Sequence, residues 1–181
     1  MKKTAIILGT SRSNGNTADV TNIVAQNTNA VVFDINDYNI LPFDYDHNNK
    51  HDDFITLIKE ILTFDNIIFS SPVYWFSPST QMKLFIDRIT DLITVEKDLG
   101  RQLKGKTTAV ISTGEYDEPK SCFEEVFQHT FEYLGMDYKG MLYCACAFDE
   151  SGDNAGSDFD LNKYQERVHN FSDIFKSNQK A

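Results

Sequence analysis

Short, largely apolar runs alternate along the chain with stretches in which apolar residues recur every three or four positions. The runs cover residues 4–8, 67–71 and 107–111, with two more at residues 31–35 and 138–148. Continuous runs of this length are typical of parallel strands covered on both faces. They predict five strands, the third of which we expect to end at Pro72.

Between these runs, the apolar positions form stripes with helical spacing. The stripes predict five helices, with apolar faces at Val20, Ile23 and Val24; at Phe54, Leu57, Ile58 and Ile61; at Met82, Phe85, Ile86 and Ile89; at Phe123, Val126, Phe127, Phe131 and Leu134; and at Leu161, Tyr164, Val168, Phe171 and Phe175. We expect Ser77 to cap the third helix, with Pro78 as its first residue. Pro119 is expected to open the fourth helix and Gly135 to end it.

Strands that alternate with helices indicate an α/β fold. We therefore predict a doubly wound, five-stranded parallel sheet with helices on both faces. The length of 181 residues and the hydrophobic content of 41% suit one domain spanning residues 1–181. Ligands of such sheets bind beyond the carboxyl ends of the strands, so the loops after the first, third and fourth strands become the candidate site.

The first of these loops, residues 9–17, has the composition of an anion site. It contains two glycines, one arginine and several small hydroxyl and amide residues, and it leads directly into a helix. The first amides of a helix lack internal partners, and the helix dipole adds partial positive charge there. The spacing matches neither a P-loop nor a dinucleotide fingerprint. We therefore interpret the loop as a site for a single terminal phosphate. The alternative interpretation is an ordinary strand-to-helix turn that binds no anion.

The other two loops are aromatic and polar. Tyr74, Trp75 and Phe76 follow the third strand, where core aromatics are unusual, so they indicate a pocket wall or an interface. The loop after the fourth strand begins at Thr113 and contains Tyr116. A ligand that carries a phosphate, a spacer and a flat ring would satisfy all three loops.

Charge and cysteine content narrow the range of partners. The formal net charge of −10 argues against binding to nucleic acid or to an anionic membrane surface. No apolar run approaches the length of a membrane span. The three cysteines, an odd number, do not resemble a disulfide framework, which favours a reducing cytoplasm.

Two groups of potential metal ligands have simpler interpretations. His47 and His51 lie among four aspartates in the polar segment 36–53, but no known ligand spacing occurs there, so we favour a solvated loop. Cys144 and Cys146 would share one face of the last strand and are interpreted as small buried hydrophobes. Segment 149–160 is acidic and is also expected to be a solvated loop. We predict no metal site.

Two motifs resemble a known family. Gly9-Thr10-Ser11-Arg12-x-x-Gly15-Asn16-Thr17 is similar to the phosphate loop of the flavodoxin-like NAD(P)H-dependent FMN reductases and quinone reductases. Ser71-Pro72-Val73-Tyr74-Trp75-Phe76-Ser77, followed by Gln81-Met82-Lys83-x-Phe85-Ile86-Asp87-Arg88, resembles the second FMN loop of that family and the helix after it. The resemblance extends to about residue 148, and the two motifs together are specific.

The resemblance implies an FMN site and a redox function. The phosphate would be held by Thr10, Ser11, Arg12, Gly15, Asn16 and Thr17, and the isoalloxazine ring would be lined by Pro72, Val73, Tyr74, Trp75 and Phe76, with Thr113, Gly114, Glu115 and Tyr116 at its other edge. NADPH or NADH would reduce the flavin, which would then reduce a small acceptor such as a quinone or a free flavin. No side chain is expected to act as a catalytic nucleophile or base.

Family members commonly place the flavin near a homodimer interface, so the resemblance implies a homodimer or higher homo-oligomer. The alternative function is a non-catalytic, flavodoxin-like electron carrier, to which an acidic surface would also be suited. The family's iron–sulfur members carry cluster cysteines after the second strand, and this chain has none between Asn36 and Asp53.

Overall fold

A parallel sheet forms the centre of the computed structural model, which describes residues 2–146 and 159–176. Five strands lie in the order β2-β1-β3-β5-β6, and all neighbours on this path are parallel. Their bounds are β1 Thr4–Leu8, β2 Val31–Asp34, β3 Asn66–Tyr74, β5 Thr107–Gly114 and β6 Asp137–Ala145. Numbered among themselves, they have the flavodoxin-like order 2-1-3-4-5. The predicted fold class is therefore confirmed.

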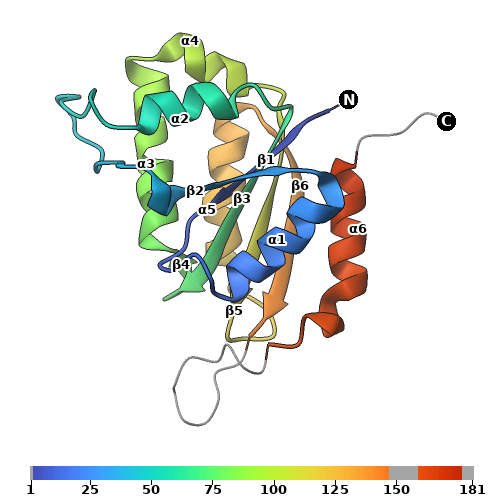
Figure 1. The fold of residues 1–181 in the computed structure, drawn as a ribbon. Coiled ribbons are helices and arrows are strands. Elements are labelled where there is room, and N and C mark those ends of the chain that lie inside the picture. Colours follow the sequence, from blue (N-terminus) through green and yellow to red (C-terminus); the bar gives the residue numbers. More distant parts are fainter. Residues whose placement is uncertain (1, 147–158, 177–181) are drawn as a thin grey trace.

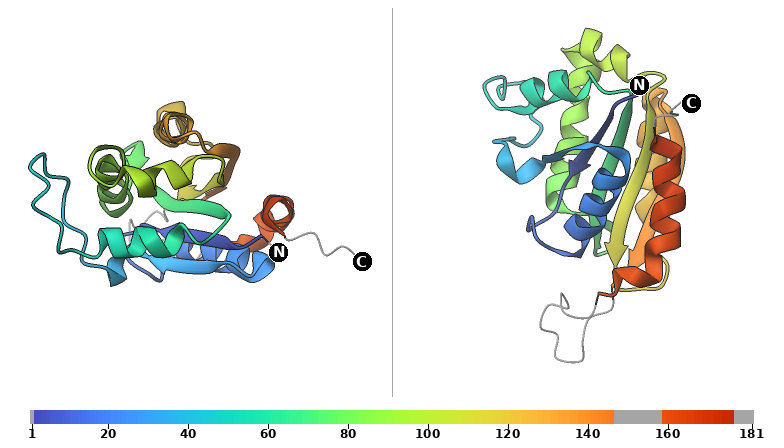
Figure 2. Two further views of the ribbon diagram at one scale, coloured as in Figure 1. Left: turned by 90° about the horizontal axis from the view of Figure 1, so that it is seen from above. Right: turned by 45° about the vertical axis from the view of Figure 1, so that its right-hand side comes forward.

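Helices cover both faces of the sheet, as Figures 1 and 2 show for α1 and α6 on one side and α3 and α5 on the other. The α-helices are α1 Asn16–Thr28, α2 Phe54–Ile61, α3 Thr80–Thr94, α4 Lys97–Gly100, α5 Ser121–Leu134 and α6 Gln165–Phe175. Short 3-10 helices span Ile35–Asp37, Arg101–Leu103 and Leu161–Tyr164. Within the described ranges, none of the helices combines the length and apolar character needed to cross a membrane.

The apolar strands are explained by two cores on opposite faces. Side chains alternate along a strand, so Ile7 packs with α2, α3 and α5 while its neighbour Ile6 packs with α1 and α6. Phe69 and Ile68 of β3 divide in the same way. Every one of these side chains is at most 3% exposed. Burial on both faces removes the polar alternation of a one-sided strand.

The third strand and the helix after it differ from the prediction. β3 runs through Pro72 to Tyr74, because residues 73–74 pair with the short antiparallel strand β4, Ser77–Pro78. Helix α3 therefore begins at Thr80, and Ser79 rather than Ser77 caps it by accepting a hydrogen bond from the Met82 amide at 3.1 Å. The expected cap at Ser77 and helix start at Pro78 are wrong, since both residues belong to a hairpin.

Smaller differences occur at other element ends. Helix α5 begins at Ser121, two residues after the expected Pro119. Gly135 ends this helix at a φ of 67°, as predicted. The residues expected to start the last helix lie partly in the 3-10 turn Leu161–Tyr164, so α6 is shorter than predicted. The predicted end of the last strand at residues 147–148, and most of the acidic loop 149–160, lie outside the described residues.

The polar segment before α2 is anchored by a buried arginine. Arg88 of α3 is 1% exposed. Its Nε donates to Asp91 at 2.9 Å, one terminal nitrogen donates to the Leu41 carbonyl at 2.8 Å, and the guanidinium pairs with Asp52. The Asp91 carboxylate also contacts His47 Nδ1 at 2.8 Å. Segment 36–53 is thus held against α3 by these contacts and is not the fully solvated loop that the sequence suggested.

The charge of Asp52 is stabilised despite its burial. Burial opposes ionisation, but the Arg88 guanidinium and the Leu41 and Phe54 amides outweigh it, so the pKa of Asp52 lies below its usual range. The guanidinium also lies 4.7 Å from the centre of the Phe54 ring. Among the described residues, no group of three His, Cys, Asp or Glu side chains could hold a metal ion.

Removing the Asp52 charge should destabilise the fold. We expect Asp52→Asn to lower the free energy of unfolding by about 3 kcal/mol, because it leaves a buried guanidinium undercompensated. The control is Lys83→Met, which breaks the exposed pair between Lys83 and Asp87 and should cost less than about 0.5 kcal/mol. Urea titrations at pH 7 measure both values, and equal losses would contradict the assignment.

The same pair sets a pH dependence. Because the folded-state pKa of Asp52 is depressed, its contribution to stability is complete above the unfolded value of about 4 and disappears as pH falls through the lower folded value. The difference in stability between parent and Asp52→Asn should therefore shrink below about pH 4. A difference that stays constant down to pH 2 would show that the carboxylate charge is not responsible.

Candidate functional site

The structure brings the three predicted site segments, residues 10–17, 72–76 and 113–116, together at the carboxyl edge of the sheet. Ser11 Oγ lies 2.7 Å from the Tyr74 hydroxyl, which joins the first segment to the hairpin after β3. Thr17 Oγ1 lies 2.6 Å from Thr113 Oγ1, which joins the start of α1 to the end of β5. Residues that are remote in sequence thus meet at one edge of the sheet.

The first segment ends in a helix start that lacks a side-chain cap. Gly15 is the N-cap of α1, with φ −99° and ψ 177°, and among the described residues no side chain caps the helix. The amides of Thr17 and Ala18 lie in the first turn, where a helix offers no internal acceptor. A Cβ on Gly15 would lie 3.0 Å from Arg12 Nε, so the arginine side chain lies close beside the N-cap residue of this helix. The arrangement combines backbone donors with a full positive charge.

Two predicted phosphate contacts have their side chains turned inward. Thr10 is 3% exposed, and its hydroxyl donates to the Arg12 carbonyl at 2.6 Å. Thr17 is 4% exposed and its hydroxyl contacts Thr113. A ligand would therefore meet these two threonines through their backbone amides. Ser11 and Arg12 are exposed.

Helix α3 is fastened to the same segment. The Gly9 amide donates to the Ser70 carbonyl at 2.8 Å, and the Gly9 carbonyl accepts from Ser79 Oγ at 2.6 Å. The Ser79 amide in turn donates to Ser71 Oγ at 3.0 Å. Ser79 was not among the predicted site residues. The sequence pattern indicated Ser77 as the cap, but Ser77 pairs with Tyr74 in the hairpin, so the cap falls at Ser79.

The aromatic hairpin has an unusual backbone. Trp75 and Phe76 form its two-residue tip, with φ values of 48° and 64°. Positive φ at both positions is the pattern of a type I′ turn, which normally takes asparagine and glycine. Such angles are costly for bulky side chains and persist where the surroundings or the function require them. Trp75 is 92% exposed, so burial of its ring does not explain the choice.

The third segment, residues 113–116, lies against β3 and β6. A Cβ on Gly114 would lie 2.8 Å from the Tyr143 hydroxyl and 3.1 Å from Val73 Cβ, so β3, β5 and β6 converge here. The Tyr143 hydroxyl donates to the Tyr116 carbonyl at 2.7 Å, and burial raises the Tyr143 pKa. The Tyr116 and Phe76 rings are nearly parallel, at 15°, with centres 6.4 Å apart. Glu115 is exposed beside them.

Cys146 is only half buried and lies beside Gly114, although the sequence indicated a buried hydrophobe. Its amide donates to the Gly114 carbonyl at 2.7 Å, and its thiol donates to the Cys144 carbonyl, with sulfur and oxygen 3.5 Å apart. The expectation is correct for Cys144, which is fully buried in the core beneath α1 and α6. Cys146 lies one step further along the same face, where β6 has already ended at the sheet edge.

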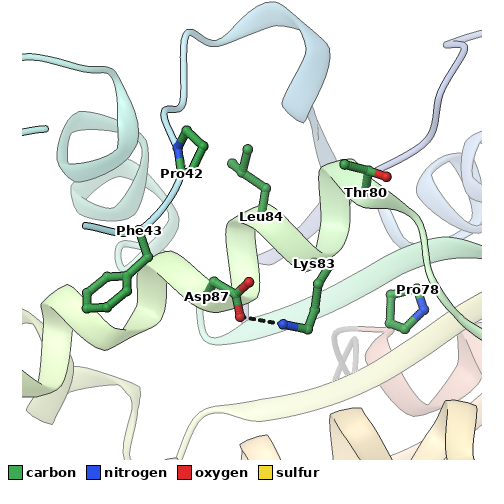
Figure 3. Close-up of a pocket in the computed structure, with 7 residues that line it drawn as sticks. All are labelled: Pro42, Phe43, Pro78, Thr80, Lys83, Leu84 and Asp87. Carbon is green, nitrogen blue, oxygen red and sulfur yellow. Dashed lines mark hydrogen bonds and ion pairs between the residues drawn. The ribbon is translucent and has the colours of Figure 1, made fainter. Parts of the chain in front are cut away.

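A separate groove of about 350 Å³ lies along α3. Figure 3 shows Pro42 and Phe43 on one side of it and Lys83 reaching towards Asp87, to which its Nζ donates at 2.5 Å. The lining residues are Pro42, Phe43, Pro78, Thr80, Lys83, Leu84 and Asp87. None of them is a predicted site residue, so the groove is distinct from the surface formed by the three segments.

An open helix start beside exposed aromatics, at the switch point of a flavodoxin-like sheet, is the arrangement typical of cofactor-binding α/β proteins of the flavin class. A sequence model of the NADPH-dependent FMN reductases matches residues 2–147. The chain is 34% identical over 151 residues to a putative NAD(P)H-dependent FMN-containing oxidoreductase of Bacillus subtilis, a match that covers 77% of this chain and 83% of the relative. The chain therefore belongs to the NADPH-dependent FMN reductase family.

Solved structures agree with the fold. The Trp repressor binding protein of Bacillus subtilis is 25% identical, with a TM-score of 0.70 over 98% of this chain and 100% of that one. An FMN-dependent NADH-azoreductase of Bacillus anthracis, solved with FMN, is 13% identical, with a TM-score of 0.69 over 97% of this chain and 100% of that one. At that identity, the second likeness concerns the fold alone.

The two loop glycines should respond differently to alanine. Gly9→Ala would place Cβ 2.8 Å from Met82 Cβ and 2.9 Å from the Met82 backbone, so we expect it to cost about 2–3 kcal/mol of stability. Gly15→Ala meets only the movable Arg12 side chain at a φ that alanine accepts, and it should cost less than about 1 kcal/mol. Thermal unfolding distinguishes them, and a larger loss for Gly15→Ala would contradict the packing described.

Proposed function

We propose that this protein uses FMN, bound across the three segments, to pass electrons from NADPH or NADH to a small acceptor such as a quinone, a free flavin or a related aromatic. The observation that carries the proposal is the joining of an uncapped helix start to an exposed aromatic hairpin at one sheet edge. The family supports the cofactor and the reductant. The acceptor is inferred from the aromatic surface.

The phosphate end of the site fits FMN. The first-turn amides of α1 and the Arg12 guanidinium provide donors for one terminal phosphate. A local positive site is needed, because the chain carries a net charge of −10. Residues Thr10, Ser11, Arg12, Gly15, Asn16 and Thr17 would surround the phosphate.

The ring end of the site fits a flat aromatic group. Pro72 to Phe76 would line one edge of the isoalloxazine ring and Thr113 to Tyr116 the other. The flavin supplies the hydride chemistry. The protein holds the ring, shields it from water, and stacks the reductant or acceptor on Tyr74, Trp75, Phe76 and Tyr116. This function requires no nucleophilic side chain.

Rapid reduction by a nicotinamide separates a reductase from an electron carrier. We expect protein loaded with FMN to lose its yellow absorbance within the first turnover when mixed anaerobically with NADH or NADPH, and to regain it on addition of a quinone. A carrier would bind FMN equally well but be reduced only by a partner protein. Stopped-flow absorbance distinguishes the two, and slow bleaching with both nicotinamides would favour the carrier.

We further infer a cytoplasmic homodimer or higher homo-oligomer. Tyr74 and Phe76 are each 42% exposed and Trp75 is 92% exposed, a concentration of aromatic surface that a second copy would cover. The cysteines of the described residues are free thiols, which suits a reducing compartment.

Loss of Arg12 should weaken FMN binding selectively. We expect Arg12→Ala to cost about 1.5–3 kcal/mol of FMN affinity, because a charge-assisted contact to the phosphate is lost. Riboflavin, which lacks the phosphate, should bind parent and variant alike. Arg101→Ala is the control, since it removes the same charge at an exposed site paired with Asp98. Fluorescence titration measures all affinities, and equal FMN binding by parent and Arg12→Ala would refute the contact.

Loss of Trp75 should affect turnover more than cofactor binding. Because the ring is exposed at the hairpin tip, we expect Trp75→Ala to lower the quinone reduction rate more than it weakens FMN binding, and to shift sedimentation towards the monomer. Tyr133→Ala, which removes an exposed aromatic from α5, is the control. An unchanged quinone rate would remove the stacking role, and a monomeric parent would remove the interface.

A further inference from the structure

We propose that Ser70 is a positioning residue that holds both ends of the phosphate loop, residues 9–17, on the end of β3. The proposal rests on the FMN function inferred above, and Ser70 lies in neither of the two family-like motifs. It depends on two hydrogen bonds, one made by the Ser70 carbonyl and one by the Ser70 hydroxyl. Together they fix the positions of Gly9 and of α1.

The backbone of Ser70 holds the start of the loop. Strands β1 and β3 are parallel neighbours, and Leu8 is paired with Ser70 in their register. One residue further on, the Gly9 amide donates to the Ser70 carbonyl at 2.8 Å. The Gly9 carbonyl accepts from Ser79 Oγ at 2.6 Å. Because both polar backbone groups of Gly9 are bonded, the chain enters the loop from a fixed position.

The side chain of Ser70 holds the helix that follows the loop. Residues two apart on a strand share one face, so Ser70 lies on the same face of the sheet as Ile68, which packs with α1. Ser70 Oγ lies 2.7 Å from Thr21 Oγ1, and both residues are 0% exposed. Because Thr21 lies in the first half of α1, this bond holds the helix shortly after the loop ends.

The direction of this bond follows from counting hydrogens. Thr21 Oγ1 donates its single hydrogen to the Thr17 carbonyl at 2.7 Å. The contact between the two hydroxyls therefore requires Ser70 to be the donor. The Thr21 hydroxyl thus joins Ser70 to the backbone of Thr17, whose own amide lies in the first turn.

Apolar packing alone would not fix the height of α1 along the sheet. Val20 of this helix is also 0% exposed, but hydrophobic contacts have no preferred direction, whereas a hydrogen bond requires a short, directed approach. The bonds from Thr21 to Ser70 and from Thr17 to Thr113 tie α1 to the adjacent strands β3 and β5. The first turn is therefore oriented before a ligand arrives, and a preorganised site costs less to order on binding.

The test compares the affinity for FMN with that for riboflavin in variants of the bond between Ser70 and Thr21. We expect Ser70→Ala and Thr21→Val each to reduce the ratio of FMN to riboflavin affinity about fivefold, equivalent to about 1 kcal/mol. The double variant should also lose about fivefold, because all three proteins lack the same bond. Thr21→Ser retains the hydroxyl and should stay within about twofold of the parent.

Thr28→Val is the matched control. Thr28 lies on the same helix and is 8% exposed, and its hydroxyl donates to the Val24 carbonyl within that helix at 2.7 Å. The substitution is the same as at Thr21, but the hydroxyl that it removes bonds to the helix itself. We therefore expect Thr28→Val to leave the ratio of FMN to riboflavin affinity unchanged.

A measurement without flavin separates this proposal from the proposed function. The Asp19 amide bonds to the Gly15 carbonyl, and the next two amides close the same turn, so exchange of the amides of residues 19–21 reports its opening. In the unliganded protein, we expect this exchange to be about threefold faster in Ser70→Ala and Thr21→Val than in Thr28→Val. A parent that binds no FMN would refute the proposed function, whereas the exchange rates would still decide the role of Ser70.

Three results would overturn the proposal. The first is a parent-like affinity ratio and parent-like exchange in Ser70→Ala, which also decides the matter if Thr21→Val does not fold. The second is a Thr28→Val variant that changes both quantities as much as Thr21→Val does. The third is an additive loss in the double variant, or a Thr21→Ser variant that behaves like Thr21→Val, because neither agrees with one shared hydrogen bond.

Discussion

The hydrogen bond between Thr17 and Thr113 sets the position of α1 over the sheet, and the candidate site depends on that position. A helix start is an anion site only where its open amides face a ligand and not the interior. Gly15 provides no side-chain cap, and the Arg12 side chain lies close beside it. The inward contacts of Thr10 and Thr17 hold the loop from below, and Ser11 and Arg12 remain exposed.

The aromatic side of the site is strained at its tip and supported at its base. Trp75 and Phe76 adopt positive φ on a two-residue turn, while Ser79 fastens the start of α3 to Gly9. Further along α3, Arg88 binds Asp52 and Leu41 and holds segment 36–53 against the helix. A rigid scaffold of this kind can keep exposed aromatic rings in one orientation, which a stacking surface requires.

Local pattern was sufficient for the sheet, its helices and the meeting of three loops, because parallel strands bring their carboxyl ends to one edge. It did not distinguish Ser77 from Ser79 as a cap, since that choice depends on the pairing of β4 with β3. The Arg88–Asp52 pair was also not predictable, because it joins residues 36 positions apart through tertiary packing. The partial exposure of Cys146 was not predicted, because a strand pattern does not show where the strand stops at the sheet edge.

The central claim is that the FMN phosphate binds at the start of α1. Backbone amide NMR during titration with FMN, and separately with riboflavin, tests it most directly. The account predicts that the amides of residues 15–18 shift strongly with FMN and little with riboflavin, while both ligands shift residues 74–76. Phosphate-dependent shifts centred instead on the α3 groove at Lys83 and Leu84, with residues 15–18 unchanged, would contradict it.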